Sequence, residues 1–229
     1  MVAGRGACPP RAGRRRRRQR RGLCRACRVD GAPRLSRSAQ ISRTTAETRI
    51  ELTLALDGSG RGTRATGVGF FDHLLDALAR HGGLDLDVRV QGDLETGPHH
   101  TVEDTGLALG RALDEALEER AGIRRFGHSS VPMDDARASC ALDVSGRPFL
   151  LFEGAFPAER VGDFDTDLAE EFMRAVATTA KLTLHVSLEA GYNAHHMIEA
   201  AFKAFARALR EAAELDPRVE GIPSTKGVL

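Results

Sequence analysis

The chain of 229 residues lacks long apolar segments and has only four cysteines. No run of 18 apolar residues occurs, so the sequence predicts no transmembrane helix. The first residues also lack the apolar segment typical of a secretory signal. Cys8, Cys24 and Cys27 lie near the start, and only Cys140 lies in the rest of the chain. This distribution is typical of the reducing cytoplasm, and we expect a cytoplasmic protein.

The net charge of +1 hides an uneven distribution of charge. Residues 1–40 contain 13 arginines and one acid, Asp30, whereas the rest of the chain has 20 basic and 31 acidic residues. We therefore expect residues 1–43 to form a disordered, Arg-rich extension. The arginines at 14–18 could attract nucleic acid electrostatically. A targeting segment, translation from an upstream start and a segment without function are the alternatives, and we favour the last and expect no nucleic-acid partner.

The most informative pattern is His-His-x-x-Glu, which occurs at His99–Glu103 and again at His195–Glu199. On a helix, the first histidine and the glutamate of each motif share one face because they are four residues apart. The second histidine points about 100° away from that face. Each motif therefore offers metal ligands in two directions, and two motifs indicate a duplicated site for two metal ions.

Both motifs belong to a longer internal repeat. When the segment around His73 is placed on the segment around Glu171, three apolar positions at 84, 86 and 88 match those at 182, 184 and 186. After a loop that is two residues shorter in the second copy, the two motifs align. The sequence thus predicts a first repeat at 44–130 and a second at 131–222, followed by a C-terminal segment that ends at residue 229.

Each repeat has the same predicted secondary structure. Residues 49–56 alternate between apolar and polar, as in a half-buried strand. Helical spacing over 72–81 stops at a glycine pair, and residues 84–90 alternate as a second strand. A longer helix is expected over 101–120. The order strand, strand, helix, strand, helix predicts an α+β fold with two sheets and the helices packed between them, because neither half alone buries enough surface.

Pseudo-symmetry between the repeats predicts which side chains share a metal ion. One set of four ligands is His99, Glu103, Glu171 and His196. The other set is His73, His100, His195 and Glu199. Imidazole and carboxylate ligands without thiolate favour manganese, iron or zinc over magnesium or calcium. Four protein ligands leave two octahedral positions open for a chelating substrate.

Several of these residues also have simpler interpretations. The histidines could be solvated helix residues or hydrogen-bonded core groups, although the duplication argues against this. Asp72 and Asp104 flank candidate ligands, so they either orient imidazole rings or lie on the surface of their helices. A di-metal hydrolase of a small phosphorylated substrate and a non-catalytic assembly or metal-storage protein are alternative functions for the same ligands.

The order of these motifs resembles that of the imidazoleglycerol-phosphate dehydratase family of histidine biosynthesis. The resemblance covers about residues 44–229, and its many ordered motifs make it specific. The matching segments are Gly69–His73, His99–Thr105, Arg124–Gly127, Pro132–Asp135, Leu142–Pro148, Asn193–His196 and Pro223–Leu229.

This resemblance implies a hydro-lyase that converts D-erythro-imidazoleglycerol phosphate to imidazole-acetol phosphate through a manganese-bound imidazolate. It also implies two Mn²⁺ ions per active site, and trimers that assemble into a cage of 24 subunits with the sites at subunit interfaces.

The resemblance also assigns roles to individual residues. It places Glu47 in proton transfer and, with His73, in contact with the substrate. It places Arg125, Arg147, Ser224 and Lys226 around the substrate phosphate. Family members carry a histidine where this chain has Glu171, but a carboxylate is also a ligand for manganese.

Overall fold

The computed structural model describes residues 37–229. The first repeat contains β1 Ser38–Thr44, β2 Thr48–Ala55, β3 Arg64–Ala65, α1 Gly69–Gly82, β4 Asp85–Gly92, the short 3₁₀ helix Leu94–Thr96 and α2 His99–Leu117. The second contains β5 Phe126–Met133, β6 Ala136–Asp143, β7 Phe149–Glu153, β8 Arg160–Val161, β9 Phe164–Asp165, α3 Leu168–Ala180, β10 Thr183–Ala190 and α4 Ala194–Ala213. Over this part of the chain, no helix is long and apolar enough to cross a membrane.

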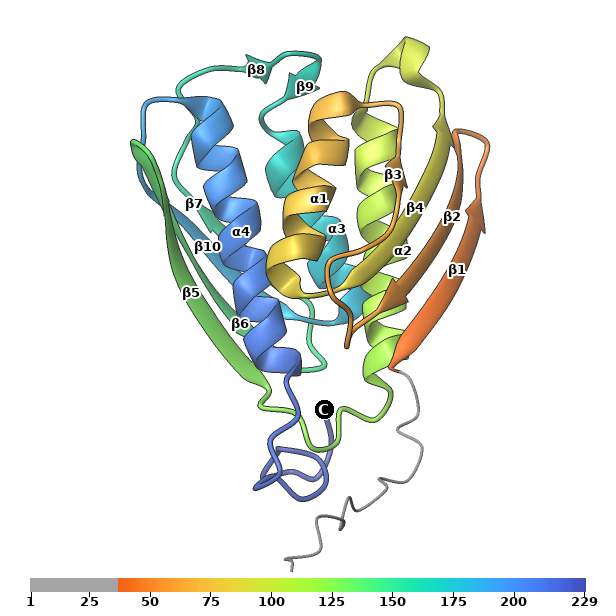
Figure 1. The fold of residues 1–229 in the computed structure, drawn as a ribbon, viewed down its shortest axis with the longest axis vertical. Helices are drawn as coiled ribbons and strands as arrows, with labels where there is room; N and C mark the ends of the chain where they lie inside the picture. Colours follow the sequence, from red (N-terminus) through yellow and green to blue (C-terminus); the bar gives the residue numbers. More distant parts are fainter. Residues whose placement is uncertain (1–36) are drawn as a thin grey trace, which may run out of the picture. The chain divides into compact units, whose positions relative to one another are not determined.

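Each repeat forms one four-stranded sheet, and the two sheets have the same topology. Their strand orders are β1-β2-β4-β3 and β5-β6-β10-β7. In both sheets the short strand pairs in parallel with its neighbour, β3 with β4 and β7 with β10, and the other pairs are antiparallel. The helices lie between the sheets (Figure 1). This arrangement confirms the expected α+β fold, its tandem duplication and its layers.

The boundaries of the repeats differ from those expected. Residues 38–43, expected to belong to the extension, form most of β1, which pairs along its full length with β2. The expected boundary at 130/131 falls inside β5. The reason is that β1 and β5 are edge strands with few apolar residues, so neither gives a strong alternating pattern. The rest of the expected extension, residues 1–36, lies outside the described residues.

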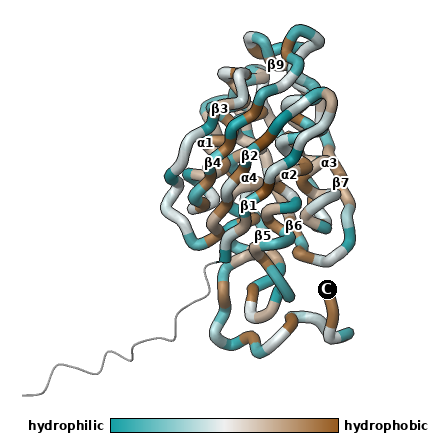
Figure 2. Tube along the Cα trace, turned by 90° about the vertical axis from the view of Figure 1, so that its right-hand side faces the viewer, coloured by the Kyte–Doolittle hydropathy of each residue, from teal (hydrophilic) through white to brown (hydrophobic). Residues whose placement is uncertain are grey.

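The strands supply one apolar face each to a shared core. Along β2 the buried positions are Thr48, Ile50, Leu52 and Leu54, and the residues between them are exposed. Figure 2 shows this succession of apolar and polar positions along the trace. Burial of each leucine or isoleucine side chain stabilises the fold by about 1.5–3 kcal/mol. The expected strand over 49–56 is therefore confirmed, and its inner face holds the helices in place.

Close contact between β5 and α4 fixes where the second sheet meets the helix that carries the second motif. Gly127 of β5 is buried, and a Cβ atom at this position would lie 2.0 Å from the backbone oxygen of Ala208 and 2.8 Å from the nitrogen of Ala212. Both neighbours are backbone atoms, so they cannot move aside by a rotamer change. Only glycine allows this approach.

We therefore expect Gly127→Ala to lower the free energy of unfolding by about 1–3 kcal/mol or more, as overpacking of a core does. Urea denaturation followed by circular dichroism measures the change. Gly69→Ala is the matched control: nothing lies within 4 Å of a Cβ atom there, and alanine favours a helix by about 1 kcal/mol over glycine. Equal stability of the two variants would show that the close contact has no energetic weight.

Candidate metal centre and active site

Packing of α1 against α4 brings together three candidate ligands from the two repeats. Nε2 of His73 and Nε2 of His195 each lie 3.2 Å from Oε2 of Glu199. The ligand atoms of these three residues all lie within 4.8 Å of one another. Phe70 packs against both imidazoles, with ring centroids 6.1 Å from His73 and 4.8 Å from His195. These three residues thus form a preorganised cluster that could hold a metal ion.

Glu199 is the buried member of this cluster, and its side chain is only 8% exposed. Its Oε1 lies 2.8 Å from Nζ of Lys203. Burial alone would raise the pKa of Glu199, but the ion pair with Lys203 and the contact with His73 outweigh burial and lower it. Within residues 37–229, the buried Oε2 atom has no hydrogen-bond partner. An unsatisfied carboxylate oxygen between two imidazole nitrogens is the environment that a divalent transition metal prefers.

A cavity of about 590 Å³ opens beside this cluster, with His73 and Glu199 in its wall. Four cationic side chains, of Arg61, Arg64, Arg80 and Lys203, also line it, together with the carboxylate of Asp76. The four cations outnumber the two carboxylates of Asp76 and Glu199, and this positive charge favours an anionic ligand next to the metal position.

The pseudo-symmetric cluster lies where α2 packs beside α3. Nε2 of His99 is 3.5 Å from Oε2 of Glu103, as expected for residues four apart on a helix. Gly106 of α2 packs against Phe172 of α3, so the first turns of the two helices lie at the same end. Those turns carry Glu103 and Glu171, and Glu171 has an ion-pair partner in Arg174 at 3.7 Å. Within residues 37–229, however, His99, Glu103 and Glu171 do not form a compact group of three ligand atoms like that of His73, His195 and Glu199, so the role of Glu171 as a ligand stays a prediction.

The second histidine of each motif leaves its cluster, as helix geometry predicts. His100 lies with Nδ1 3.0 Å from Oδ2 of Asp93 and Nε2 3.6 Å from Oε1 of Glu47. The hydrogen bond between His100 and Asp93 raises the pKa of the imidazole and lowers the pKa of the carboxyl. The expected second ligand set is therefore incomplete within one chain, because His100 is not in the cluster of His73.

His196 has a similar environment at the start of α4. Its Nδ1 is 2.6 Å from Oδ1 of Asp135, and its Nε2 is 3.7 Å from Oδ2 of Asp134. The hydrogen bond with His196 is the main cause that lowers the pKa of Asp135 to about 2. His196 thus faces its own carboxylates, and within residues 37–229 no metal-ligand cluster includes it.

Asp72 and Asp104 do not contact the imidazoles. Asp72 accepts hydrogen bonds from the backbone and hydroxyl of Thr66. Asp104 is buried and accepts from Arg43 and from the hydroxyl of Thr48. Both aspartates therefore hold their helices against neighbouring segments. Neither expected role fits Asp104, because it contacts no imidazole among residues 37–229 and is buried rather than on the helix surface.

Sequence reasoning missed three residues of this site, namely Lys203, Asp93 and Asp135. Lys203 follows Glu199 by four residues on α4, so helix spacing could have identified it. Asp93 precedes His100 by seven residues across a turn, and Asp135 is 61 residues from His196. Nothing in local spacing indicates these two contacts.

Arg125, expected to bind a phosphate, lies at the other end of α4 and contacts the C-terminal segment. Arg125 forms two hydrogen bonds with Asp143, at 2.7 and 3.1 Å, and a third with the backbone oxygen of Pro223 at 2.9 Å. The carbonyl carbon of Leu229 packs against Gly146, next to the exposed Arg147. The C-terminal segment that carries Ser224 and Lys226 is thus tied down beside both arginines.

These phosphate candidates are far from the metal cluster of the same chain. The backbone nitrogen of Arg125 donates to the oxygen of Ala212, which is thirteen residues beyond Glu199 on α4. A helix rises 1.5 Å per residue, so about 20 Å separates the two levels. One small substrate cannot reach both groups within one chain.

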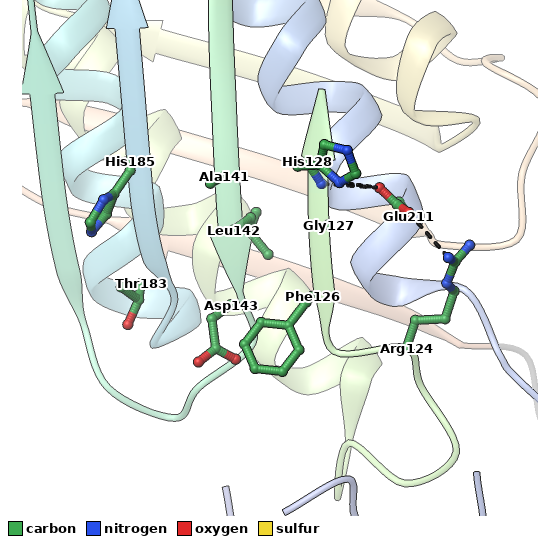
Figure 3. Close-up of a pocket in the computed structure, with 10 residues that line it drawn as sticks. All are labelled: Arg124, Phe126, Gly127, His128, Ala141, Leu142, Asp143, Thr183, His185 and Glu211. Carbon is green, nitrogen blue, oxygen red and sulfur yellow. Dashed lines mark hydrogen bonds and ion pairs between the residues drawn. The ribbon is translucent and has the colours of Figure 1, made fainter. Parts of the chain in front are cut away.

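A second cavity, of about 550 Å³, lies on the outer face of the second sheet. Figure 3 shows Phe126 and His185 on separate strands of this face, with Glu211 joined to His128 and Arg124 at one side. None of the candidate metal ligands lines this cavity. It is therefore separate from the candidate metal ligands, but it adjoins the phosphate candidates, because Asp143, which binds Arg125, lines it.

Comparison of the sequence and the structure with known proteins identifies similar proteins. A family model described as imidazoleglycerol-phosphate dehydratase matches residues 66–209. This span includes both His-His-x-x-Glu motifs and all four helices except the last few residues of α4.

Curated relatives and solved structures carry the same description. The imidazoleglycerol-phosphate dehydratase of Jannaschia sp. is 56% identical over 84% of this chain and 100% of its own length. That of Symbiobacterium thermophilum is 58% identical over 84% of this chain and 93% of its own length. The crystal structure of the Staphylococcus aureus enzyme is 40% identical, covers 78% of this chain and 99% of its own, and superposes with a TM-score of 0.72. A Pyrococcus furiosus structure in complex with (S)-C348 is 36% identical, covers 82% of this chain and 100% of its own, with the same TM-score.

Proposed function

The chain belongs to the imidazoleglycerol-phosphate dehydratase family, and we propose that it removes water from D-erythro-imidazoleglycerol phosphate to give imidazole-acetol phosphate. It is accordingly a carbon–oxygen lyase of the hydro-lyase type, in histidine biosynthesis. A cytoplasmic location remains part of the proposal and rests on the cysteine distribution.

The observation that carries the proposal is the buried Oε2 of Glu199, which lies 3.2 Å from Nε2 of both His73 and His195 and, within residues 37–229, has no hydrogen-bond partner. This arrangement suits a divalent metal and favours the metal-dependent reaction over a purely structural role for the histidines. Within one chain, each of the two proposed ligand sets has only three of its four members near one pair of helices. We propose that His100 of one chain completes the set of His73, His195 and Glu199 in a neighbouring chain.

By the same symmetry, His196 of one chain completes the other set in a neighbouring chain. That set consists of His99, Glu103 and Glu171. We propose Mn²⁺ at both positions, two ions per active site. When bound, divalent cations would supply the positive charge that stabilises the anionic form of the substrate's imidazole ring.

Side chains of the protein carry out binding and proton transfer in this proposal. The carboxylate of Glu47 lies 3.6 Å from Nε2 of His100, and its Oε1 takes the C–H proton from the carbinol carbon that becomes the ketone carbon. The hydroxyl on the carbon next to the imidazole ring leaves and takes up a proton to depart as water. The resulting enol gives the ketone when its hydroxyl proton is lost and the carbon next to the ring gains a proton. Arg125 uses three of its five N–H donors within the protein, which leaves two for a phosphate oxygen. Arg147, Ser224 and Lys226 complete the phosphate site and fix the orientation of the substrate.

An active site shared between subunits accounts for the separation of about 20 Å between metal and phosphate groups of one chain. We propose that trimers form and assemble into a cage of 24 subunits. In such a particle, the C-terminal segment of one subunit can reach the metal ions of another. Size-exclusion chromatography with light scattering measures the assembly.

The test is direct conversion of substrate by the purified protein. With imidazoleglycerol phosphate and Mn²⁺, we expect the ketone product to appear in proton NMR spectra, and we expect its formation to stop when a chelator removes the metal. Release of inorganic phosphate without ketone would instead identify a di-metal hydrolase. Metal-dependent assembly without any turnover would identify a storage or assembly protein, and either result would refute the proposal.

A further inference from the structure

The two histidines that leave the clusters share one pattern of contacts. In each ring, Nδ1 contacts a carboxylate at short range: His100 contacts Asp93 at 3.0 Å, and His196 contacts Asp135 at 2.6 Å. In each ring, Nε2 lies on the opposite side and is 3.6–3.7 Å from a more exposed carboxylate. The side of each ring that carries Nε2 is therefore the one left for a ligand.

Repeat symmetry does not produce the shared contact at Nδ1. Asp93 lies between β4 and α2, whereas Asp135 lies in the turn between β5 and β6. The offset of 98 residues that relates β4 to β10 places Gly191, not an aspartate, at the position of Asp93. The two repeats thus reach the same imidazole geometry by different connections, which points to a requirement of the histidines themselves.

Further hydrogen bonds hold both carboxylates in place. Asp135 has a side chain that is 8% exposed, and its Oδ2 accepts from the backbone nitrogens of Tyr192 and Asn193 just before α4. Asp93 has a side chain that is 21% exposed and accepts from the hydroxyl of Thr96. The imidazoles therefore meet fixed acceptors rather than freely rotating side chains.

We propose that Asp93 and Asp135 are positioning residues, which hold a proton on Nδ1 of His100 and His196 and so present the Nε2 lone pair to a metal ion. A carboxylate that accepts from Nδ1–H fixes the tautomer and the ring plane, and it raises the basicity of the other nitrogen. The inference rests on the metal sites of the proposed function and adds the residues that orient their shared ligands.

The proposal assigns each aspartate to a different metal. Asp93 acts through His100, so it supports the ion bound by His73, His195 and Glu199. Asp135 acts through His196, so it supports the ion of the other set. Each single variant should therefore weaken one class of site and leave the other unchanged.

The experiment titrates MnCl₂ into the full-length, metal-free protein and measures free Mn²⁺ by its EPR signal. We expect two classes of site in the parent protein. In Asp93→Asn and in Asp135→Asn, one class should bind about 10–100-fold more weakly, as loss of an outer carboxylate does. The double variant should weaken both classes. Asp93→Ala should weaken its class further than Asp93→Asn, because an amide oxygen can still accept from Nδ1–H.

Asp85→Asn is the matched control. Asp85 also accepts from two backbone nitrogens, of Ser59 and Arg61, but it touches no histidine among the hydrogen bonds of residues 37–229. Thermal unfolding of each metal-free variant measures loss of fold. The proposal predicts weaker Mn²⁺ binding that does not scale with the loss of thermal stability.

Three results would overturn it. Unchanged affinity in both single variants would remove the positioning role and leave the metal sites standing. Equal weakening in Asp85→Asn would assign the effect to a general loosening of the fold. A parent protein that binds no Mn²⁺ would refute the metal sites of the proposed function, and this inference with them.

Discussion

Replacement of Glu47 by glutamine is expected to lower kcat for dehydration by a factor of about 10²–10⁴, the range that general acid–base catalysis contributes. The amide keeps the size and one oxygen of the carboxylate but cannot accept the proton. Glu47 is half exposed in the turn between β1 and β2, and it contacts His100 only at 3.6 Å. The substitution should therefore leave the fold, Mn²⁺ binding and assembly intact.

Glu51→Gln is the control for this prediction. Glu51 lies on β2, four residues further along, and its exposed carboxylate accepts from Ser42 at 2.9 Å. Its replacement should leave kcat within a factor of about two, because Glu51 has no role in the proposed proton transfer. The fold should also be kept, since surface substitutions usually change the free energy of unfolding by less than about 0.5 kcal/mol. Steady-state assays of both variants decide the question: if Glu47→Gln retains the parent kcat, proton transfer belongs to another group.

The fold was largely predictable because its main elements depend on local periodicity. Alternation gave β2 and β4, and helical spacing with the terminal glycines gave α1, whose C-cap Gly83 has a left-handed conformation with φ of 66°. The internal repeat then required two equal sheets. Edge strands such as β1 were not predictable. Such a strand pairs on one side only and buries few side chains, so its sequence does not alternate between apolar and polar residues.

In the candidate site, too, contacts that depend on local spacing were predictable and contacts between distant segments were not. His195 and Glu199 are neighbours on one helix, so their spacing predicts their contact, and the His73 contact follows from repeat symmetry. The contact of His196 with Asp135 joins residues 61 positions apart, and it depends on how the β5–β6 turn meets the start of α4. No one-chain pattern predicts such a contact, and none predicts the arrangement of subunits that we propose for the metal and phosphate groups.

Glu199→Gln is expected to abolish the metal site at the α1–α4 contact. Glutamine keeps the volume of this nearly buried side chain, but it removes the only anionic ligand beside His73 and His195 among residues 37–229. It also leaves the ammonium of Lys203, now without its partner at 2.8 Å, to repel a cation. The affinity of this class for Mn²⁺ should fall by more than the factor of about 10–100 that loss of an outer partner costs.

Dehydration should be lost with the metal, because in the proposed mechanism both ions would be needed to bind one imidazole ring. The other class of Mn²⁺ site should keep its affinity, which separates loss of a ligand from unfolding. Glu211→Gln, near the opposite end of α4, tests whether any change of charge on this helix has the same effect; its carboxylate pairs with Arg124 at 3.1 Å and lies far from the cluster. If Glu199→Gln still binds Mn²⁺ at two classes of site with the affinities of the parent protein, Glu199 is not a metal ligand. The observation on which the proposed chemistry rests would then no longer support it.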